Sequence, residues 1–482
     1  MKTIKLLGLG AAMFPLILAT PVLAEAAAAD VSAAGEAPDA NDIIVNAEIV
    51  YRDRTPDPNP VLTYGVDFFQ RFEPVSVGEM LKRVPGVTFT SDVLEYDGVQ
   101  FRGLPPGFTQ VLINGRRAPG GESDRSFFVD RLPAELIEKI EIVRSPSADQ
   151  PSEGVAGTLN VVTKESISFE GGFAKLGTLI NKDGKARPSG AIAYAGKLGE
   201  ATTMWAGLNY QERRNPKKKV SLRYDDIFSG DGSPADPDFD NTELQDDTRD
   251  GRDISGNAEI SHEFDGGGRI RLSGLYVDTD RDEDETSLTY EGPDLDFDEA
   301  EIQHEEIRQK SYAINSDAKL PIGAFELGLA AGWNGYRENT VATVSEAGEE
   351  DLSDAGVTEI DTLRIRDNEY TGTLSLTWGD DTPLRVKAGV DLLSKKRRGS
   401  DVVEEFDDGE PDGTEVDPAV NFTIKEKRYD PYLRVTYEPS SAISVDGACA
   451  TRSPVAARRA RPASTAATTA SRSIPRCTCA IR

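Results

Sequence analysis

The chain contains few of the residues that enzymes use most often for metal and redox chemistry. Its 482 residues include two histidines and three cysteines. His262 and His304 lie in polar or acidic surroundings, and neither has a second histidine at the spacing of a zinc site. Cys477 and Cys479, near the end of the chain, lack the spacing of a redox or zinc motif. We therefore expect no metal site and no cofactor.

Motifs of calcium, phosphate and hydrolase sites are also missing. Asp278, Asp280 and Asp282 match the start of a calcium-binding loop. Glu283 stands where that loop needs glycine, however, and Thr289 stands where it needs glutamate. The sequence has no glycine-rich phosphate loop and no G-x-S-x-G element. These absences predict a protein that is not an enzyme and has no catalytic residues.

Long hydrophobic runs are lacking beyond the N-terminus. Lys2 and Lys5 precede an apolar run from Leu6 to Ala19, and small residues follow at the cleavage positions of a secretory signal. We interpret residues 1–24 as a signal peptide, because the run is too short for a membrane-spanning helix. An exported chain without another such run is a periplasmic protein, a secreted protein or an outer-membrane β-barrel.

The charge is strongly acidic and uneven. The formal net charge is −29, and Asp and Glu concentrate in residues 225–250, 278–305, 346–361 and 401–417, with Gly and Pro among them. We expect these stretches to be long solvated loops. A polar average composition agrees with a barrel, in which every membrane strand turns one face toward a wet interior.

Between the acidic stretches, apolar and polar residues alternate with the period of a strand. From Phe325 to Trp333 the odd positions are apolar and the even positions are polar or small. About eleven such strands are predicted, at residues 172–181, 189–198, 201–214, 249–263, 268–283, 303–318, 323–340, 358–378, 383–399, 421–437 and 441–448. Short turns alternate with the acidic stretches, which is typical of outer-membrane barrels. A soluble β-sandwich is the alternative.

A small mixed α/β domain is predicted before these strands, at residues 67–166. Apolar residues at helical spacing end at Pro85 and Gly86, which predicts a helix over residues 77–84. The strand at residues 110–114 ends in Asn114-Gly115, a tight-turn signal. Two further strands follow at residues 136–143 and 155–163. An ordinary soluble α+β domain would show the same pattern.

Several segments of this domain resemble one protein family. Ile137–Lys164 resembles the end of the plug domain of TonB-dependent outer-membrane receptors. Val77–Val87, Val99–Leu104 and Thr109–Arg117 resemble earlier plug elements, in the family's order. The segment DIIVNA resembles the TonB box, the extended segment that pairs with the periplasmic TonB protein; its residues are Asp42, Ile43, Ile44, Val45, Asn46 and Ala47. Read alone, DIIVNA is more typical of a buried strand than of a TonB box.

The resemblance implies a plug domain followed by an outer-membrane β-barrel that takes up a scarce ligand, of which an iron–siderophore complex is the commonest. It implies TonB, outer-membrane lipid and the extracellular ligand as partners, and no nucleic acid. Arg102 and Arg144 match plug arginines that pair with barrel carboxylates; a surface salt bridge is the alternative role. A passive pore-forming or structural outer-membrane protein, or a nonfunctional fragment, is the alternative to a receptor.

The end of the chain departs from the family. Residues 167–448 supply about half of the 22 strands that the resemblance implies, so we expect a partial barrel, and residues 25–66 form a flexible leader with the TonB box. Residues 449–482 contain seven arginines, no acid and no aromatic residue. We expect this basic tail to be out-of-frame sequence that truncates the receptor. A genuine basic tail that binds nucleic acid or a membrane surface is the alternative.

Overall fold

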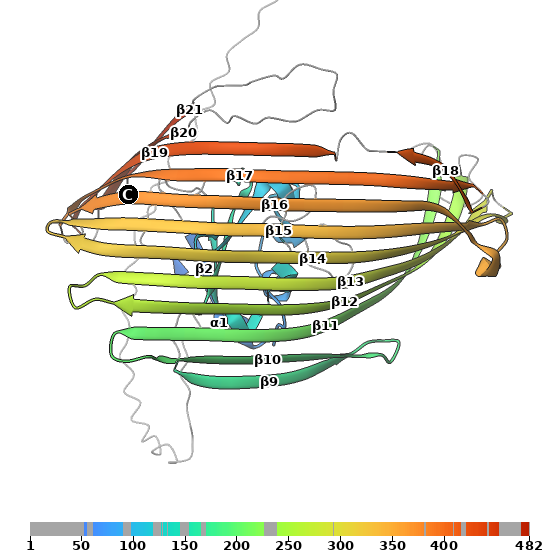
Figure 1. Cartoon of the computed structure of the whole chain (residues 1–482), viewed down its shortest axis with the longest axis horizontal. Coiled ribbons are helices and arrows are strands. Elements are labelled where there is room, and N and C mark those ends of the chain that lie inside the picture. The colour runs from blue at the N-terminus through green and yellow to red at the C-terminus, as the bar shows by residue number, and fades with distance from the viewer. Residues whose placement is uncertain are drawn as a thin grey trace, which may run out of the picture. The chain divides into compact units, whose positions relative to one another are not determined.

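A computed structural model describes one large β-sheet, a smaller six-stranded β-sheet and a two-stranded ribbon (Figure 1). The described residues are 53–54, 61–89, 98–118, 127, 129–132, 134–144, 154–164, 170–225, 239–292, 294–379, 382–407, 409–415, 421–440, 443–452 and 474–481. No helix among them is long and apolar enough to cross a membrane. The described residues up to 164 form what we call the small domain, and those from 170 form what we call the large sheet.

The small domain is built on a six-stranded sheet in the order β1-β2-β7-β8-β5-β6. The strands are β1 (Asp53–Arg54), β2 (Val61–Gly65), β5 (Thr109–Ile113), β6 (Arg116–Arg117), β7 (Ile137–Val143) and β8 (Gly157–Thr163). Only β5 and β8 pair in parallel. The other elements are α1 (Val66–Gln70), α2 (Val77–Leu81), the ribbon β3 (Val87–Phe89) and β4 (Val99–Phe101), and the 3-10 turns η1 (Pro106–Phe108), η2 (Val129–Arg131) and η3 (Ala134–Leu136). β1 and β2 precede residue 67, the expected start of this domain.

Helix α2 begins where its sequence provides a cap. The Ser76 hydroxyl accepts a hydrogen bond from the Glu79 N–H at 3.2 Å, and the Glu79 carboxylate accepts one from the Val75 N–H at 2.9 Å. The spacing S-x-x-E satisfies N–H groups that a helix start leaves unpaired. Val77, Met80 and Leu81 are then almost fully buried in the core. The cap therefore fixes the position of Ser76 itself, which matters for the site described below.

The large sheet is a continuous antiparallel meander. Its strands are β9 (Gly171–Ile180), β10 (Ala186–Lys197), β11 (Thr202–Tyr224), β12 (Phe239–Glu263), β13 (Arg269–Glu291), β14 (Asp296–Ile322), β15 (Phe325–Ala347), β16 (Gly356–Trp378), β17 (Leu384–Asp407), β18 (Glu410–Glu415), β19 (Phe422–Ser440), β20 (Ile443–Arg452) and β21 (Ile474–Ile481). Neighbours in sequence are neighbours in the sheet, except that β18 pairs with β17 beside β19 (Figure 1). All eleven predicted strands are present, so the prediction of a small α/β domain followed by an antiparallel partial barrel is confirmed.

The prediction that the acidic stretches are long loops is wrong for most of their described residues. β12 and β13 run together as far as Asn241 and Glu291, and β13 and β14 close at Glu291 and Asp296. These extensions stay paired because cations stand among the acids: Arg249 lies 3.3 Å from Glu283, and Arg252 lies 2.7 Å from Asp280. Backbone ladder bonds and neutralising arginines thus make acidic strands possible.

A strand also lies where none is predicted. The alternation is expected to stop at Cys449, yet β20 continues to Arg452 and the backbone of β21 pairs with β20. The backbone of residues 474–481 therefore belongs to the large sheet, although the sequence analysis places these residues in the basic tail beyond the barrel. The edge of β20 presents unpaired N–H and C=O groups, and any extended segment can satisfy them.

Two rows of aromatic side chains mark a band on one face of the large sheet. Close to the short turns lie Phe325, Trp378 and Tyr437, which are 43%, 39% and 47% exposed. Eight residues farther along the same three strands lie Trp333, Tyr370 and Tyr429, also exposed. Eight residues span roughly 27 Å along a strand, which at the tilt of about 40° usual in outer-membrane barrels gives a height of roughly 20 Å, comparable with their apolar band of about 25 Å. We call this face the outer face and the second row the upper aromatic row.

Candidate functional site

The opposite face of the large sheet, the inner face, contacts the small domain through a buried chain of polar groups. Arg213 of β11 donates to Asp130 of η2 at 2.5 Å and pairs with Asp253 of β12 at 2.9 Å. Asp130 also accepts a hydrogen bond from the Ser76 hydroxyl at 2.5 Å, and Asp253 accepts one from Thr279 of β13 at 2.6 Å. The two carboxylates are 6% and 2% exposed. Two helical elements of the small domain are thereby joined to three strands.

A second polar contact lies at the hairpin of β5 and β6. Arg117 lies 3.6 Å from Glu369 of β16, and its backbone carbonyl accepts a hydrogen bond from the Asn334 amide of β15 at 3.0 Å. Lys395 of β17 also pairs with Glu369, at 3.4 Å. The Asn114-Gly115 turn directs this hairpin, because both residues adopt positive φ. The predicted tight turn is therefore what places Arg117 against the large sheet.

The neighbouring Arg116 is also turned toward the large sheet. Burial lowers the pKa of its guanidinium below the ordinary value, and Asp317 and Asp391 of the inner face oppose this effect. A guanidinium stays charged in proteins, so Arg116 adds a positive charge facing two inner-face carboxylates. Together with Arg117 it makes the tip of the hairpin complementary in charge to the inner face.

A cavity of about 810 Å³ lies between the small domain and the first strands of the large sheet. Ser76, Glu79 and Asp130 line it on one side, and Arg187 and Arg213 on the other. The contact of Ser76, Asp130 and Arg213 therefore borders open space. A ligand-sized volume lies beside the groups that hold the small domain.

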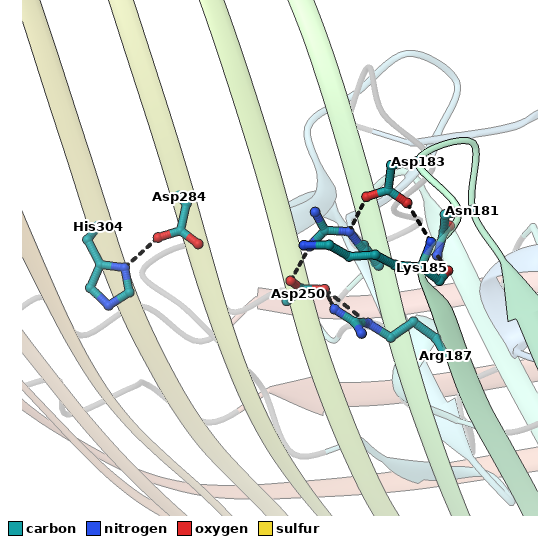
Figure 2. A network of polar contacts seen from close by, with 8 residues as sticks. Asn181, Asp183, Lys185, Arg187, Asp250, Asp284 and His304 are labelled. Carbon is teal, nitrogen blue, oxygen red and sulfur yellow. Dashed lines mark hydrogen bonds and ion pairs between the residues drawn. The ribbon is translucent and has the colours of Figure 1, made fainter. Parts of the chain in front are cut away.

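Along the edge of this cavity, charged groups of the first strands form a network (Figure 2). Asp250 of β12 accepts from Arg187 of β10 at 2.5 Å and also pairs with Arg214 of β11. Arg214 donates to Asp183 in the turn between β9 and β10 at 2.7 Å, and this hydrogen bond holds the pKa of Asp183 below its ordinary value. The network ties that exposed turn to two neighbouring strands.

The histidines have separate partners. The His304 ring lies 2.7 Å from the Asp284 carboxylate, apart from the arginine network (Figure 2). The His262 ring lies 2.8 Å from the Thr202 hydroxyl. Within the described parts of the chain, no group of three or more His, Cys, Asp or Glu side chains is arranged to hold a metal ion.

The residues that the sequence singled out lie in different places. The TonB box, Asp42–Ala47, lies outside the described residues. Arg102 follows β4 with a φ of 57°, and Arg144 follows β7; both side chains are exposed. Neither forms an ion pair with another described residue, so the pairing of Arg102 and Arg144 with barrel carboxylates stays a prediction.

The contacts that do join the two parts escaped the sequence analysis. Asp130 lies in a segment without regular alternation, and Arg213 lies within a run of charged residues in β11. The motif Ser76-x-x-Glu79 was a readable signal for the start of α2. It could not have shown that the same serine binds Asp130.

Comparison with known proteins gives one family match and several partial relatives. Residues 56–158 match the family described as the TonB-dependent receptor plug domain. The chain is 30% identical over 179 residues to the vitamin B12 transporter BtuB of Vibrio vulnificus (strain CMCP6). This alignment covers 33% of this chain and 28% of that protein. It is 30% identical over 104 residues to the ferrienterobactin receptor of Escherichia coli (strain K12), in an alignment that covers 18% of this chain and 14% of that protein. The chain thus covers less than a third of these relatives.

Solved structures cover more of the chain at lower identity. The ferric citrate transporter FecA in its unliganded form aligns with a TM-score of 0.47 and 12% identity, over 82% of this chain and 63% of that one. The siderophore receptor PiuA from Acinetobacter baumannii aligns with a TM-score of 0.46 and 12% identity, over 82% and 64%. The relatives named here are transporters and receptors, and none is named as an enzyme.

Proposed function

We propose that the chain serves in the uptake of a ligand across a bacterial outer membrane. The premise is that it belongs to the TonB-dependent receptors through its plug domain at residues 56–158. The observation that carries this proposal is the polar attachment of the small domain to the inner face, through Asp130–Arg213 and Arg117–Glu369. Charged contacts can exchange their partners for water, whereas the apolar part of the interface, where Trp205 and Val277 of the large sheet join the core of the small domain, would expose its surface on opening. The polar contacts are therefore the part of the interface that can be exchanged at low cost.

The coupling partner in this proposal is the periplasmic TonB protein, bound at Asp42–Ala47. An extended segment that adds a strand to a partner's sheet binds through backbone N–H and C=O groups, so backbone geometry matters more than side-chain identity. A pull transmitted from there reaches α2 and η2, where Ser76 and Asp130 meet Arg213. Release of this contact would enlarge the cavity beside it.

We further propose an iron–siderophore complex as the ligand. Support comes from the relatives: one is named a ferrienterobactin receptor and another a probable siderophore receptor, PirA of Acinetobacter baumannii, which is 26% identical over 133 residues. The vitamin B12 transporter among them makes cobalamin the competing ligand.

The test measures binding of the TonB periplasmic domain to the full chain in detergent. Val45→Pro removes one backbone N–H and should abolish binding, whereas Val45→Thr keeps the extended backbone and should bind within about twofold of the natural chain. Equal binding by both variants would contradict the proposed coupling and favour a passive pore. Radiolabelled ferric siderophores and cobalamin, offered separately, then identify the ligand by retention on the chain.

A further inference from the structure

The outer face carries two rows of like charge beyond the upper aromatic row, on the side away from the short turns. The first row consists of three arginines on strands that are neighbours in Figure 1. Arg337 of β15 stands opposite Arg366 of β16, which stands opposite Arg398 of β17. All three residues are exposed, and none forms an ion pair with another described residue. We call them the arginine row.

The second row consists of carboxylates on the three preceding strands. Asp250 of β12 stands opposite Asp282 of β13, which stands opposite Glu306 of β14. Asp282 is exposed and forms no ion pair with another described residue. Glu306 lies 3.2 Å from Arg308, and Asp250 belongs to the network of Figure 2. We call these three residues the acidic row.

Each row is unfavourable within the chain that carries it, because like charges opposite each other on one face destabilise a sheet. The inner face does not relieve the arginine row. On β16, Arg366 and Tyr370 point outward. Asp367 and Glu369 point inward, are 3% and 6% exposed, and already pair with Lys395. Both rows would therefore be stabilised by opposite charges from outside the chain.

A second copy of this chain offers both charges in the required order. The acidic row lies on β12 to β14 and the arginine row on β15 to β17, so the two rows meet at the boundary of β14 and β15. A twofold axis along the membrane normal at this boundary places β13 of one copy against β16 of the other. Because a twofold contact is isologous, each acidic row then faces the partner's arginine row.

The two rows also lie at comparable levels. On β16, Arg366 lies four residues from Tyr370 of the upper aromatic row. On β13, Asp282 lies six residues from Tyr276, an exposed side chain that continues this row beside Tyr312. The difference of two residues is roughly 7 Å along a strand, or about 5 Å in height at the usual tilt. The long side chain of an arginine can bridge this difference.

A furrow at the level of the upper aromatic row provides an apolar contact for the same arrangement. It has a volume of about 880 Å³ and is lined by Tyr276 and Trp333 and by the small residues Gly256 and Gly274. Small residues let two surfaces within a membrane approach closely. The twofold axis brings β16 of the second copy to this furrow, where the ring of Tyr370, which is 55% exposed, has room.

We propose that two copies of the chain associate through the outer faces of β12 to β17. Each acidic row lies against the partner's arginine row, and each Tyr370 enters the partner's furrow. A phosphate-bearing lipid would neutralise the arginine row alone and would be repelled by the acidic row, whereas a second copy neutralises both. The association is independent of the transported ligand and of TonB.

The test measures self-association of the full chain in dodecyl maltoside by sedimentation equilibrium. The natural chain should form a dimer that weakens with added salt. R337E/R366E makes both rows predominantly acidic and D282R/E306R makes both predominantly basic, so each variant alone should associate about a hundredfold more weakly. An equimolar mixture of the two variants should associate again, because opposite charges then meet. Recovery in the mixture also shows that both variants are folded.

Matched controls lie on the same face. K425E/K427E reverses two exposed cations of β19, outside the proposed contact, and should associate within about twofold of the natural chain. Tyr370→Ala should weaken association about tenfold, whereas Tyr429→Ala, in the same aromatic row, should not. R337Q/R366Q removes the charges without reversing them. It should weaken association about tenfold and tests the contact even where the reversed chains do not fold.

Three results would each overturn the proposal: a natural chain that sediments as a monomer, a mixture of the two reversed variants that stays dissociated, or an equal loss of association in K425E/K427E. Loss of bound phosphate-bearing lipid from R337E/R366E without any change in its self-association would also overturn it, and would assign the arginine row to lipid.

Discussion

Arg213 of the large sheet and Asp130 of the small domain are joined at 2.5 Å with little access to water. Arg213 keeps a second carboxylate, Asp253, at 2.9 Å, while Asp130 keeps the Ser76 hydroxyl. The pair is thus the middle of a longer chain of groups. Its loss should loosen the small domain while leaving both neighbours partly satisfied.

Asp130→Asn should lower the free energy of local opening at α2 and η2 by about 2 kcal/mol, because a buried cation loses one of its two anions. Amide hydrogen exchange in the full chain measures this, with exchange of Met80 and Leu81 accelerated. The control is Asp246→Asn, whose partner Lys218 is 79% exposed and whose loss should cost at most about 0.5 kcal/mol. Unchanged exchange in Asp130→Asn would remove the pair from the attachment of the small domain.

Gly335→Ala should disturb the upper aromatic row. A methyl group at Gly335 would overlap the ring of Tyr312, its cross-strand partner, and that ring packs 5.0 Å from Trp333. We expect a loss of about 1–3 kcal/mol in stability and a changed near-ultraviolet circular dichroism signal. Gly356→Ala has no neighbour within 4 Å and should leave both unchanged.

Glu305→Gln should change how stability depends on pH. Burial, together with Glu283 directly opposite, raises the pKa of Glu305 to about 7, although Arg281 and Arg249 oppose the shift and Glu338 adds to it. Protonation of Glu305 stabilises the folded chain relative to the unfolded one. This contribution is fully present below the pKa of Glu305 in the unfolded chain, near 4.5, and is lost as the pH rises through about 7.

The natural chain should therefore lose stability as the pH rises from 5 to 8. In Glu305→Gln the loss of unfolding free energy over the same range should be smaller by about 1 kcal/mol, a value that allows for solvent screening. Thermal unfolding in detergent at both pH values measures the difference. Glu350→Gln, an exposed residue beyond β15, is the control. Parallel pH curves for Glu305→Gln and the natural chain would show that the repulsion from Glu283 is already relieved.

A fragment of residues 50–166 should fold alone, whereas residues 67–166 should not unfold cooperatively. The shorter fragment lacks β2, which pairs with β7 and buries Leu62 and Tyr64. Removing two buried side chains costs about 4 kcal/mol, a large part of the stability of a small domain. Urea unfolding followed by circular dichroism compares the fragments. Equal midpoints would place the start of the folding unit at residue 67, as the sequence predicts.

The sequence predicts strands wherever one side of the strand is apolar. Phe325 to Trp333 alternates clearly, and its strand is found within two residues of the predicted start. Acidic residues 284–291 and 296–302 hide their strand character, because the cations that neutralise such acidic strands, as Arg249 does for Glu283, come from another strand. Local patterns cannot show such partners.

The candidate site illustrates the same limit. Asn114-Gly115 predicts its turn from local chemistry, because glycine and asparagine tolerate positive φ. Asp130 and Arg213 lie 83 positions apart in sequence, and no periodicity connects them. Only the packing of η2 against β11 reveals the pair.

The separation of charges between the two faces of β16 also bears on how the barrel strands find their alignment. A strand that slips by one residue exchanges its faces. In β16 such a slip would turn Asp367 and Glu369 to the outer face and carry Arg366 to the inner face. It would also turn Leu374 and Leu376 away from the outer face, so the charges and the apolar residues disfavour the same misalignment.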